Sequence, residues 1–197
     1  MVYKKIDKAT VLQRVTQLFK QKGYHFSSME QIAYECGLSK SSIYHYAVSK
    51  EAFLKWVLLE FHHQLKETVF LRTKQYDAPA EKKLWFLAEQ LKVFYLNTDE
   101  GCLMANILME VIETESTYRP LFKSFFNDWI EAIAAILGEK LNHEMAVKIA
   151  EDMTAQCQGA LLLARVYQDN KIFTRVLDRL SSLLLVKENE LVAFSEC

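Results

Sequence analysis

Glycine and proline are scarce in this sequence, which has five Gly and two Pro among 197 residues. These residues dominate the tight turns that connect the many short strands of β-sandwiches and β-barrels. Their scarcity excludes such folds and favours long helices. A hydrophobic share of 51% also excludes an intrinsically disordered chain.

Long apolar segments are missing as well. The longest stretch without a charged residue runs from Met153 to Ala164, which is too short to span a bilayer. The N-terminal residues MVYKKIDKAT have no apolar segment behind their lysines, so they do not form a signal peptide. We therefore expect a soluble, cytoplasmic protein that spans no membrane.

Metal-binding and enzyme motifs are not found. The four cysteines, at positions 36, 102, 157 and 197, are too far apart for CxxC pairs, so we expect reduced thiols, no metal and no cofactor. His62 and His63 are adjacent, whereas a helical metal pair needs a spacing of four residues. Without a Gly-rich phosphate loop, a GxSxG elbow or an HExxH motif, we do not expect an enzyme.

Charge is distributed unevenly along the chain. The net charge is −1, but the residues up to Trp56 include nine Lys and Arg against four Asp and Glu. The remaining residues carry 15 basic and 21 acidic side chains. A basic N-terminal part on an acidic remainder predicts a local contact with a polyanion.

Hydrophobic periodicity predicts an all-α protein of about nine helices. Residues 1–48 would form a small module of three short helices, and residues 49–197 a larger helical body. Asp7, Ser27 or Ser28, and Ser39 are suitable N-caps for the three short helices. Longer helices are expected at about residues 49–74, 79–97, 102–115, 119–141, 143–168 and 171–186.

The sequence MEQIAYECGLSKSSIYHY, residues 29–46, fits a helix-turn-helix. Ala33 allows two helices to cross closely, Gly37 allows a tight turn, and Leu38 and Ile43 fix the crossing angle. The second helix combines a cation, hydroxyls and flat rings, which suit phosphates and base edges in the major groove.

The longer stretch GYHFSSMEQIAYECGLSKSSIYHYAVSKEAFL, residues 23–54, resembles the DNA-binding domain of the TetR family of bacterial transcriptional regulators. The resemblance lies in the Gly-Tyr, the Ser pair, Ile-Ala before the Gly turn, Ser-Lys, Tyr-His-Tyr and Ser-Lys-Glu. Two positions depart from the family pattern: Ser41 replaces a frequent Gly, and Ala47 replaces an aromatic residue.

The resemblance implies a set of DNA contacts. Residues of the second helix would meet DNA, while Ser28 and Lys50, near the starts of neighbouring helices, would hold phosphates. Capping is the alternative role for Ser28, and core packing for Tyr46. The full predicted set is Ser28, Lys40, Ser41, Ser42, Tyr44, His45, Tyr46 and Lys50.

Two apolar stripes mark the last long helices. Periodicity alone shows that these stripes are buried, and the resemblance implies that they form a four-helix bundle in a homodimer. The predicted interface residues are Met153, Cys157, Ala160, Ala164, Phe173, Leu177, Leu180 and Leu184. Arg165 lies between apolar stretches of the sequence. It would either contact the partner chain in the dimer, which we favour, or bind a carboxylate of a ligand.

Aromatic and methionine residues are concentrated in the middle of the chain. They would ordinarily form a core, but the resemblance implies a cavity for a small-molecule effector. The residues predicted for it are Trp85, Cys102, Met104, Asn106, Met109, Phe122, Phe126 and Trp129. Asn106, Glu110 and Glu113 share a helix face that is either solvated or in contact with the effector. Cys102 would sense electrophiles only if a cation activated it, and a buried structural role is favoured.

These features lead to one expected function and one alternative. The expected function is a TetR-like repressor that leaves a palindromic double-stranded DNA operator when a small, moderately apolar ligand binds. The alternative is a DNA-binding protein without a small-molecule effector, which acts architecturally or through a protein partner.

Overall fold

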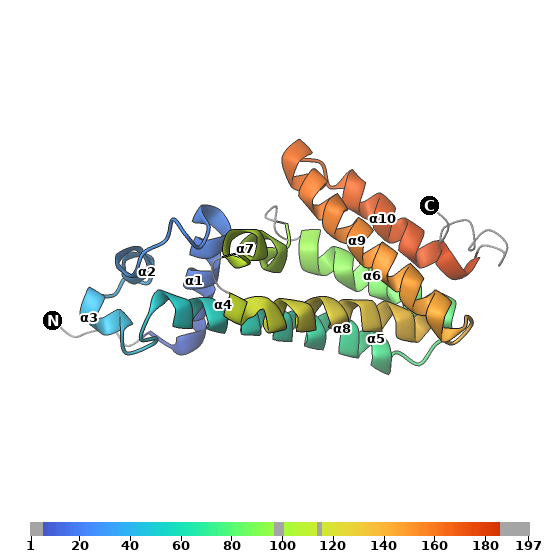
Figure 1. Ribbon diagram of the computed structural model, residues 1–197, viewed down its shortest axis with the longest axis horizontal. Helices are drawn as coiled ribbons and strands as arrows, with labels where there is room; N and C mark the ends of the chain where they lie inside the picture. The colour runs from blue at the N-terminus through green and yellow to red at the C-terminus, as the bar shows by residue number, and fades with distance from the viewer. Residues whose placement is uncertain (1–5, 97–100, 114–115, 186–197) are drawn as a thin grey trace. The chain divides into compact units, whose positions relative to one another are not determined.

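The computed structural model describes residues 6–96, 101–113 and 116–185 (Figure 1). In these ranges the chain forms helices and turns and no strand, which confirms the all-α prediction. No helix in the described ranges is both long and apolar enough to cross a membrane.

The helices follow the predicted order closely. Three short helices come first: α1 (Lys8–Lys22), α2 (Met29–Glu35) and α3 (Lys40–Ile43). Next, α4 (Lys50–Leu65) continues through a π-helical segment, η1 (Lys66–Leu71), into α5 (Arg72–Gln75). The remaining elements are α6 (Ala80–Leu96), α7 (Leu103–Val111), the 3₁₀ turn η2 (Ser116–Tyr118), α8 (Arg119–Leu137), α9 (His143–Tyr167), α10 (Lys171–Ser182) and the 3₁₀ turn η3 (Leu183–Leu185). Because α4, η1 and α5 are continuous, the described ranges agree with the prediction of about nine helices.

Side-chain caps explain where the first helices begin. The Asp7 carboxylate accepts a hydrogen bond of 2.8 Å from the Thr10 backbone N–H. Ser28 forms the predicted capping box with Gln31, and the Ser39 hydroxyl accepts from the Ser42 N–H. These bonds satisfy N–H groups that have no partner within the helix.

The described residues divide into two compact units. The first, called here the head unit, contains the described residues up to His62 and those from Leu103 to Leu121. The second, the body unit, contains the described residues from His63 to Cys102 and those from Phe122 onward.

This division differs from the predicted boundary at residue 48. The first turns of α4 bury Phe53, Leu54 and Val57 completely and belong to the head unit, which also includes α7. The sequence indicates where a loop ends and a helix begins. It does not indicate the point within α4 at which one compact unit ends and the other begins, because the helix continues through it.

Each unit has an aromatic core. In the head unit, Phe19 and Tyr24 are buried and their rings meet edge to face at 5.6 Å. In the body unit, α10 packs against α6 and α9. There the ring of Tyr95 stacks on Trp129 at 5.7 Å and meets Phe173 edge to face at 5.9 Å. Such pairs add about 0.5–1.5 kcal/mol each beyond the burial of their surface.

Candidate DNA-binding surface

Helices α2 and α3 form the predicted helix-turn-helix. Gly37 adopts a φ of 65°, which glycine tolerates best, and the Leu38 N–H donates to the Ala33 carbonyl at 2.9 Å. Ala33 is 3% exposed and Ile43 is fully buried, as the crossing of two short helices requires. The turn fixes the direction in which α3 leaves α2.

Arg14 on α1 provides a brace that the sequence did not reveal. Its guanidinium donates to the carbonyl of Cys36 at 2.9 Å and to that of Glu35 at 3.3 Å, at the C-terminal end of α2. A cation at this end also interacts favourably with the helix dipole. Arg14 therefore ties α1 to the turn between α2 and α3.

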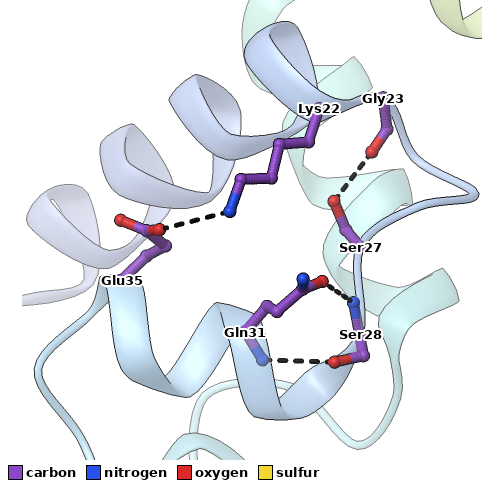
Figure 2. A network of polar contacts seen from close by, with 6 residues as sticks. All are labelled: Lys22, Gly23, Ser27, Ser28, Gln31 and Glu35. Carbon is purple, nitrogen blue, oxygen red and sulfur yellow. Dashed lines mark hydrogen bonds and ion pairs between the residues drawn. The ribbon is translucent and has the colours of Figure 1, made fainter.

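The loop between α1 and α2 is held by a small polar network (Figure 2). The Ser27 hydroxyl donates to the Gly23 carbonyl at 2.7 Å, and the Ser27 side chain is buried. Next to it, the Ser28 hydroxyl accepts from the Gln31 N–H while the Gln31 side chain accepts from the Ser28 N–H. The Ser28 side chain thus has a capping role within the chain.

The outer side of α3 and the turn after it carry most of the predicted DNA contacts. Lys40, Ser41, Tyr44 and His45 are exposed, and Ser42 is half-buried. The Ser39 hydroxyl lies 2.9 Å from the Ser41 hydroxyl and 2.8 Å from the Ser42 hydroxyl, which orders the serines at the start of α3. The group therefore presents a cation, hydroxyls and flat rings to solvent.

Lys40 is not a free cation. Its ammonium group forms an ion pair with Glu30 on α2. The hydrogen bond between them lowers the pKa of Glu30 and raises the pKa of Lys40 from their ordinary values. A carboxylate thus lies on the surface that was predicted to meet phosphates.

Two other predicted contacts make bonds inside the head unit. The Tyr46 hydroxyl donates to the Ile6 carbonyl at 2.6 Å, which agrees with the alternative structural role for this half-buried residue. The Lys50 ammonium donates to the Tyr24 carbonyl at 3.1 Å and lies 4.2 Å from the centre of the Tyr24 ring. Lys50 therefore helps to hold the start of α4 against the loop after α1.

Helix α7 contacts the same loop through Glu110. The Glu110 carboxylate accepts from the His25 backbone N–H at 2.9 Å, and His25 Nε2 lies 2.8 Å from the Glu110 carbonyl oxygen. A Cβ added to Gly23 would lie 3.0 Å from the same carboxylate, so glycine allows this approach. Glu110 was placed on a face that is solvated or in contact with an effector. In the structure its carboxylate binds the loop between α1 and α2 within the head unit.

The predicted effector residues differ in their exposure. Cys102, Met104, Phe122 and Trp129 are buried, and Asn106 and Phe126 are half-buried. Trp85 and Met109 are 54% and 80% exposed, which contradicts an interior position for them. Their helical phase was misjudged, because the sequence around both is apolar on more than one face.

Two cavities are described in the body unit. One, of about 610 Å³, is lined by residues of α6, α9 and the segments next to them, and the other, of about 380 Å³, by residues of η1, α5, α6 and α8. None of the predicted effector residues is among the described residues that line either cavity.

The predicted dimer residues face the interior of a single chain. All of them are buried except Leu184, which is half-buried, so they leave little surface for a partner. The exposed apolar residues of α9 lie on its other side: Leu162, Leu163, Val166 and Tyr167. The periodicity identified the buried stripe correctly, and the dimer contacts that the resemblance implied for these residues stay a prediction.

The described cysteines are free thiols in apolar surroundings. Burial raises the pKa of Cys36 to about 11 and that of Cys157 to about 12, so both stay protonated at neutral pH. Cys102 is 3% exposed and accepts a hydrogen bond of 3.7 Å from the Tyr95 hydroxyl, in agreement with a structural role. Cys197 lies outside the described residues.

A braced helix-turn-helix with an exposed polar α3, joined to a helical body, defines a DNA-binding transcriptional regulator. Residues 12–57 match the model of the bacterial regulatory proteins of the tetR family. Residues 86–179 match the C-terminal domain of LmrA/YxaF-like transcriptional regulators. The chain belongs to the TetR family, as the resemblance of residues 23–54 implied.

Individual relatives cover most of the chain. The HTH-type transcriptional repressor DhaR of Mycobacterium sp. (strain GP1) is 24% identical over 82% of this chain and 83% of its own length. An HTH-type regulator in the lacX 3′ region of Lactococcus lactis subsp. lactis is 27% identical over 89% of this chain and 91% of its own length. The crystal structure of a TetR transcriptional regulator from Legionella pneumophila superposes with a TM-score of 0.81 at 20% identity, covering 94% of this chain and all of that one.

Proposed function

We propose that the protein is a cytoplasmic, homodimeric repressor that binds a two-fold symmetric operator and is released by a small molecule. The observation that carries the proposal is the helix-turn-helix, whose turn and brace leave Lys40, Ser41, Tyr44 and His45 exposed together on one surface. The repressor assignment is supported by the relative DhaR, which is an HTH-type transcriptional repressor.

In this proposal the exposed residues of α3 and the following turn enter the major groove. Tyr44 and His45 offer rings and polar atoms to base edges, whereas Lys40 and the serine hydroxyls bind phosphate oxygens. The Lys50 ammonium group donates one of its three N–H groups to the Tyr24 carbonyl, so the other two can bind a phosphate. Ser28 and Tyr46 would contribute to DNA binding mainly by stabilising the head unit.

The dimer would form through the outer face of α9. Leu162, Leu163, Val166 and Tyr167 are exposed there by 61%, 44%, 66% and 67%. Two-fold pairing of such faces would present two α3 helices to half-sites about one helical turn, or a multiple of one, apart.

Release requires a ligand that prefers the arrangement unable to bind DNA, because equal affinity for both arrangements shifts nothing. The cavities of the body unit are of a size that small molecules occupy in other proteins, about 300–1,000 Å³. A ligand that stabilises the native state would raise the melting temperature. A protein without an effector would show no such shift.

Selection of bound sequences from a random duplex library tests the DNA-binding part of the proposal. We expect an inverted repeat, with affinity that falls steeply as salt rises, because phosphate neutralisation releases counterions. Failure to enrich any sequence at low ionic strength would overturn the assignment to sequence-specific regulation.

A further inference from the structure

The cavity of about 610 Å³ in the body unit is lined by both apolar and polar residues. The larger apolar residues are Tyr95 and Leu96, at the end of α6, and Leu161, on α9. The polar residues are Arg165, in the last turn of α9, and the amides Gln168 and Asn170, between α9 and α10. A ligand with one polar group and an apolar part therefore suits this lining.

Arg165 is the only cation among the described residues that line this cavity. Its guanidinium forms no ion pair or hydrogen bond with the described part of the chain. The backbone that follows it is fixed, because Gln168 adopts a left-handed φ of 52° and its N–H donates to the Ala164 carbonyl. Arg165 is exposed, and an exposed guanidinium next to two amides, with no partner in the described ranges, suits an anion.

We propose that this cavity binds an apolar monocarboxylic acid, with Arg165 as the residue that pairs with the carboxylate. A guanidinium binds a carboxylate through two parallel hydrogen bonds. One cation matches one negative charge, whereas a phosphate monoester would bring a second charge with no partner in the described lining. The hydrocarbon part would lie against Leu96, Leu161 and the Tyr95 ring.

The cavity lies directly before helix α7 in the chain. The Tyr95 hydroxyl donates to Cys102 Sγ at 3.7 Å, and α7 begins at the next residue, Leu103. On α7, Glu110 holds the His25 N–H of the head unit. A ligand that moves the Tyr95 ring would disturb the start of the helix that holds the loop between α1 and α2. This regulatory consequence rests on the proposed function, whereas binding of the acid does not.

Matched pairs of acids and amides test the inference. Straight-chain acids of four to twelve carbons and phenyl-substituted acids would be titrated by calorimetry, each beside its primary amide, which has the same skeleton without the charge. We expect at least one acid to bind ten-fold or more tightly than its amide. Arg165→Gln would weaken binding of that acid at least ten-fold. Arg175→Gln, which removes an exposed guanidinium of α10 outside the cavity, would change it less than two-fold.

Operator binding is measured separately on the same variants. Arg165→Gln would bind the selected duplex as the unchanged protein does, but the acid would no longer release it. If no acid binds better than its amide, or if both arginine variants bind the acid equally well, the carboxylate site is overturned. If the acid binds and the protein ignores DNA, the site stands and the proposed function fails.

Discussion

Glu30 and Lys40 form an ion pair on the surface proposed to meet DNA. The carboxylate competes with phosphate for the ammonium group, and it also repels the DNA backbone. Because hydrogen bonding to Lys40 lowers the pKa of Glu30, the carboxylate stays ionised at neutral pH. The exposed pair itself adds little to stability, so its main effect would be on DNA affinity.

Glu30→Gln is expected to strengthen operator binding by about three- to ten-fold at low salt, since Lys40 is released and a negative charge is lost. The matched control is Glu35→Gln, which removes the same charge from α2 but leaves Lys40 paired. Fluorescence anisotropy with the selected duplex measures both. An effect of Glu30→Gln no larger than that of Glu35→Gln would contradict a competing role for Glu30.

Gly37→Ala is expected to destabilise the protein through backbone strain alone. The added Cβ would lie 3.7 Å from Arg14 Nη1, which is an ordinary contact, but a positive φ costs an alanine about 1–2 kcal/mol. Gly159→Ala, in the middle of α9 with open space around it, is expected to stabilise by about 0.5–1 kcal/mol. Chemical unfolding at one protein concentration compares the two, and effects of the same sign would contradict the argument.

Helix α9 has two apolar sides with different surroundings. One side, which includes Met153, Cys157 and Ala160, is buried within the chain, while the other exposes Leu162 and Val166. An exposed apolar strip on a helix is costly unless a partner covers it. This arrangement supports α9 as the element that pairs in the dimer.

Val166→Glu combined with Leu163→Glu is expected to convert the dimer to a monomer, because four carboxylates would face one another across a two-fold axis. Analytical ultracentrifugation measures the mass in solution. Val93→Glu, at an exposed apolar position of α6, controls for the added charge and is expected to remain dimeric. A double variant that stays dimeric would place the interface elsewhere.

The helix-turn-helix could be predicted from sequence because its determinants are local. The Ser28 cap, the Gly37 turn and buried Ala33 and Ile43 all lie within a short stretch. Arg14, in contrast, binds carbonyl groups that lie 21 and 22 positions further along the chain, and the bond between His25 and Glu110 spans 85 positions. Such bonds depend on how helices pack, and no local sequence pattern predicts them.

The body could be predicted only in outline. Helix positions and the buried stripe follow from periodicity, but periodicity does not say whether a stripe meets its own chain or a partner. Trp85 and Met109 were expected inside and are exposed, because a small error in helical phase moves a side chain to the opposite face. The cavity beside Arg165 is formed by residues from several elements, so only the fold reveals it.

At the scale of the whole molecule, regulation needs a connection between body and head. Helix α7 follows the body residue Cys102 directly in the chain and belongs to the head unit, where Glu110 accepts from the His25 N–H. The connection is therefore covalent at one end of the helix and hydrogen-bonded at the other.

Glu110→Ala is expected to speed hydrogen exchange of the His25 amide by about ten-fold or more, because the N–H loses its acceptor. Glu113→Ala, at an exposed position two residues beyond the end of α7, would leave that amide protected. Amide exchange followed by NMR resolves the single residue. Equal protection of His25 in both variants would contradict a holding role for Glu110.

The central claim is that the exposed residues of α3 and its turn bind operator DNA, and equilibrium binding of the selected duplex tests it most directly. The variant with both Lys40→Ala and Tyr44→Ala is expected to lose at least a hundred-fold in affinity while it keeps the helical content and mass of the unchanged protein. Lys123→Ala, which removes an exposed cation of α8, would bind within two-fold of the unchanged protein. Full operator binding by a folded double variant would contradict the claim.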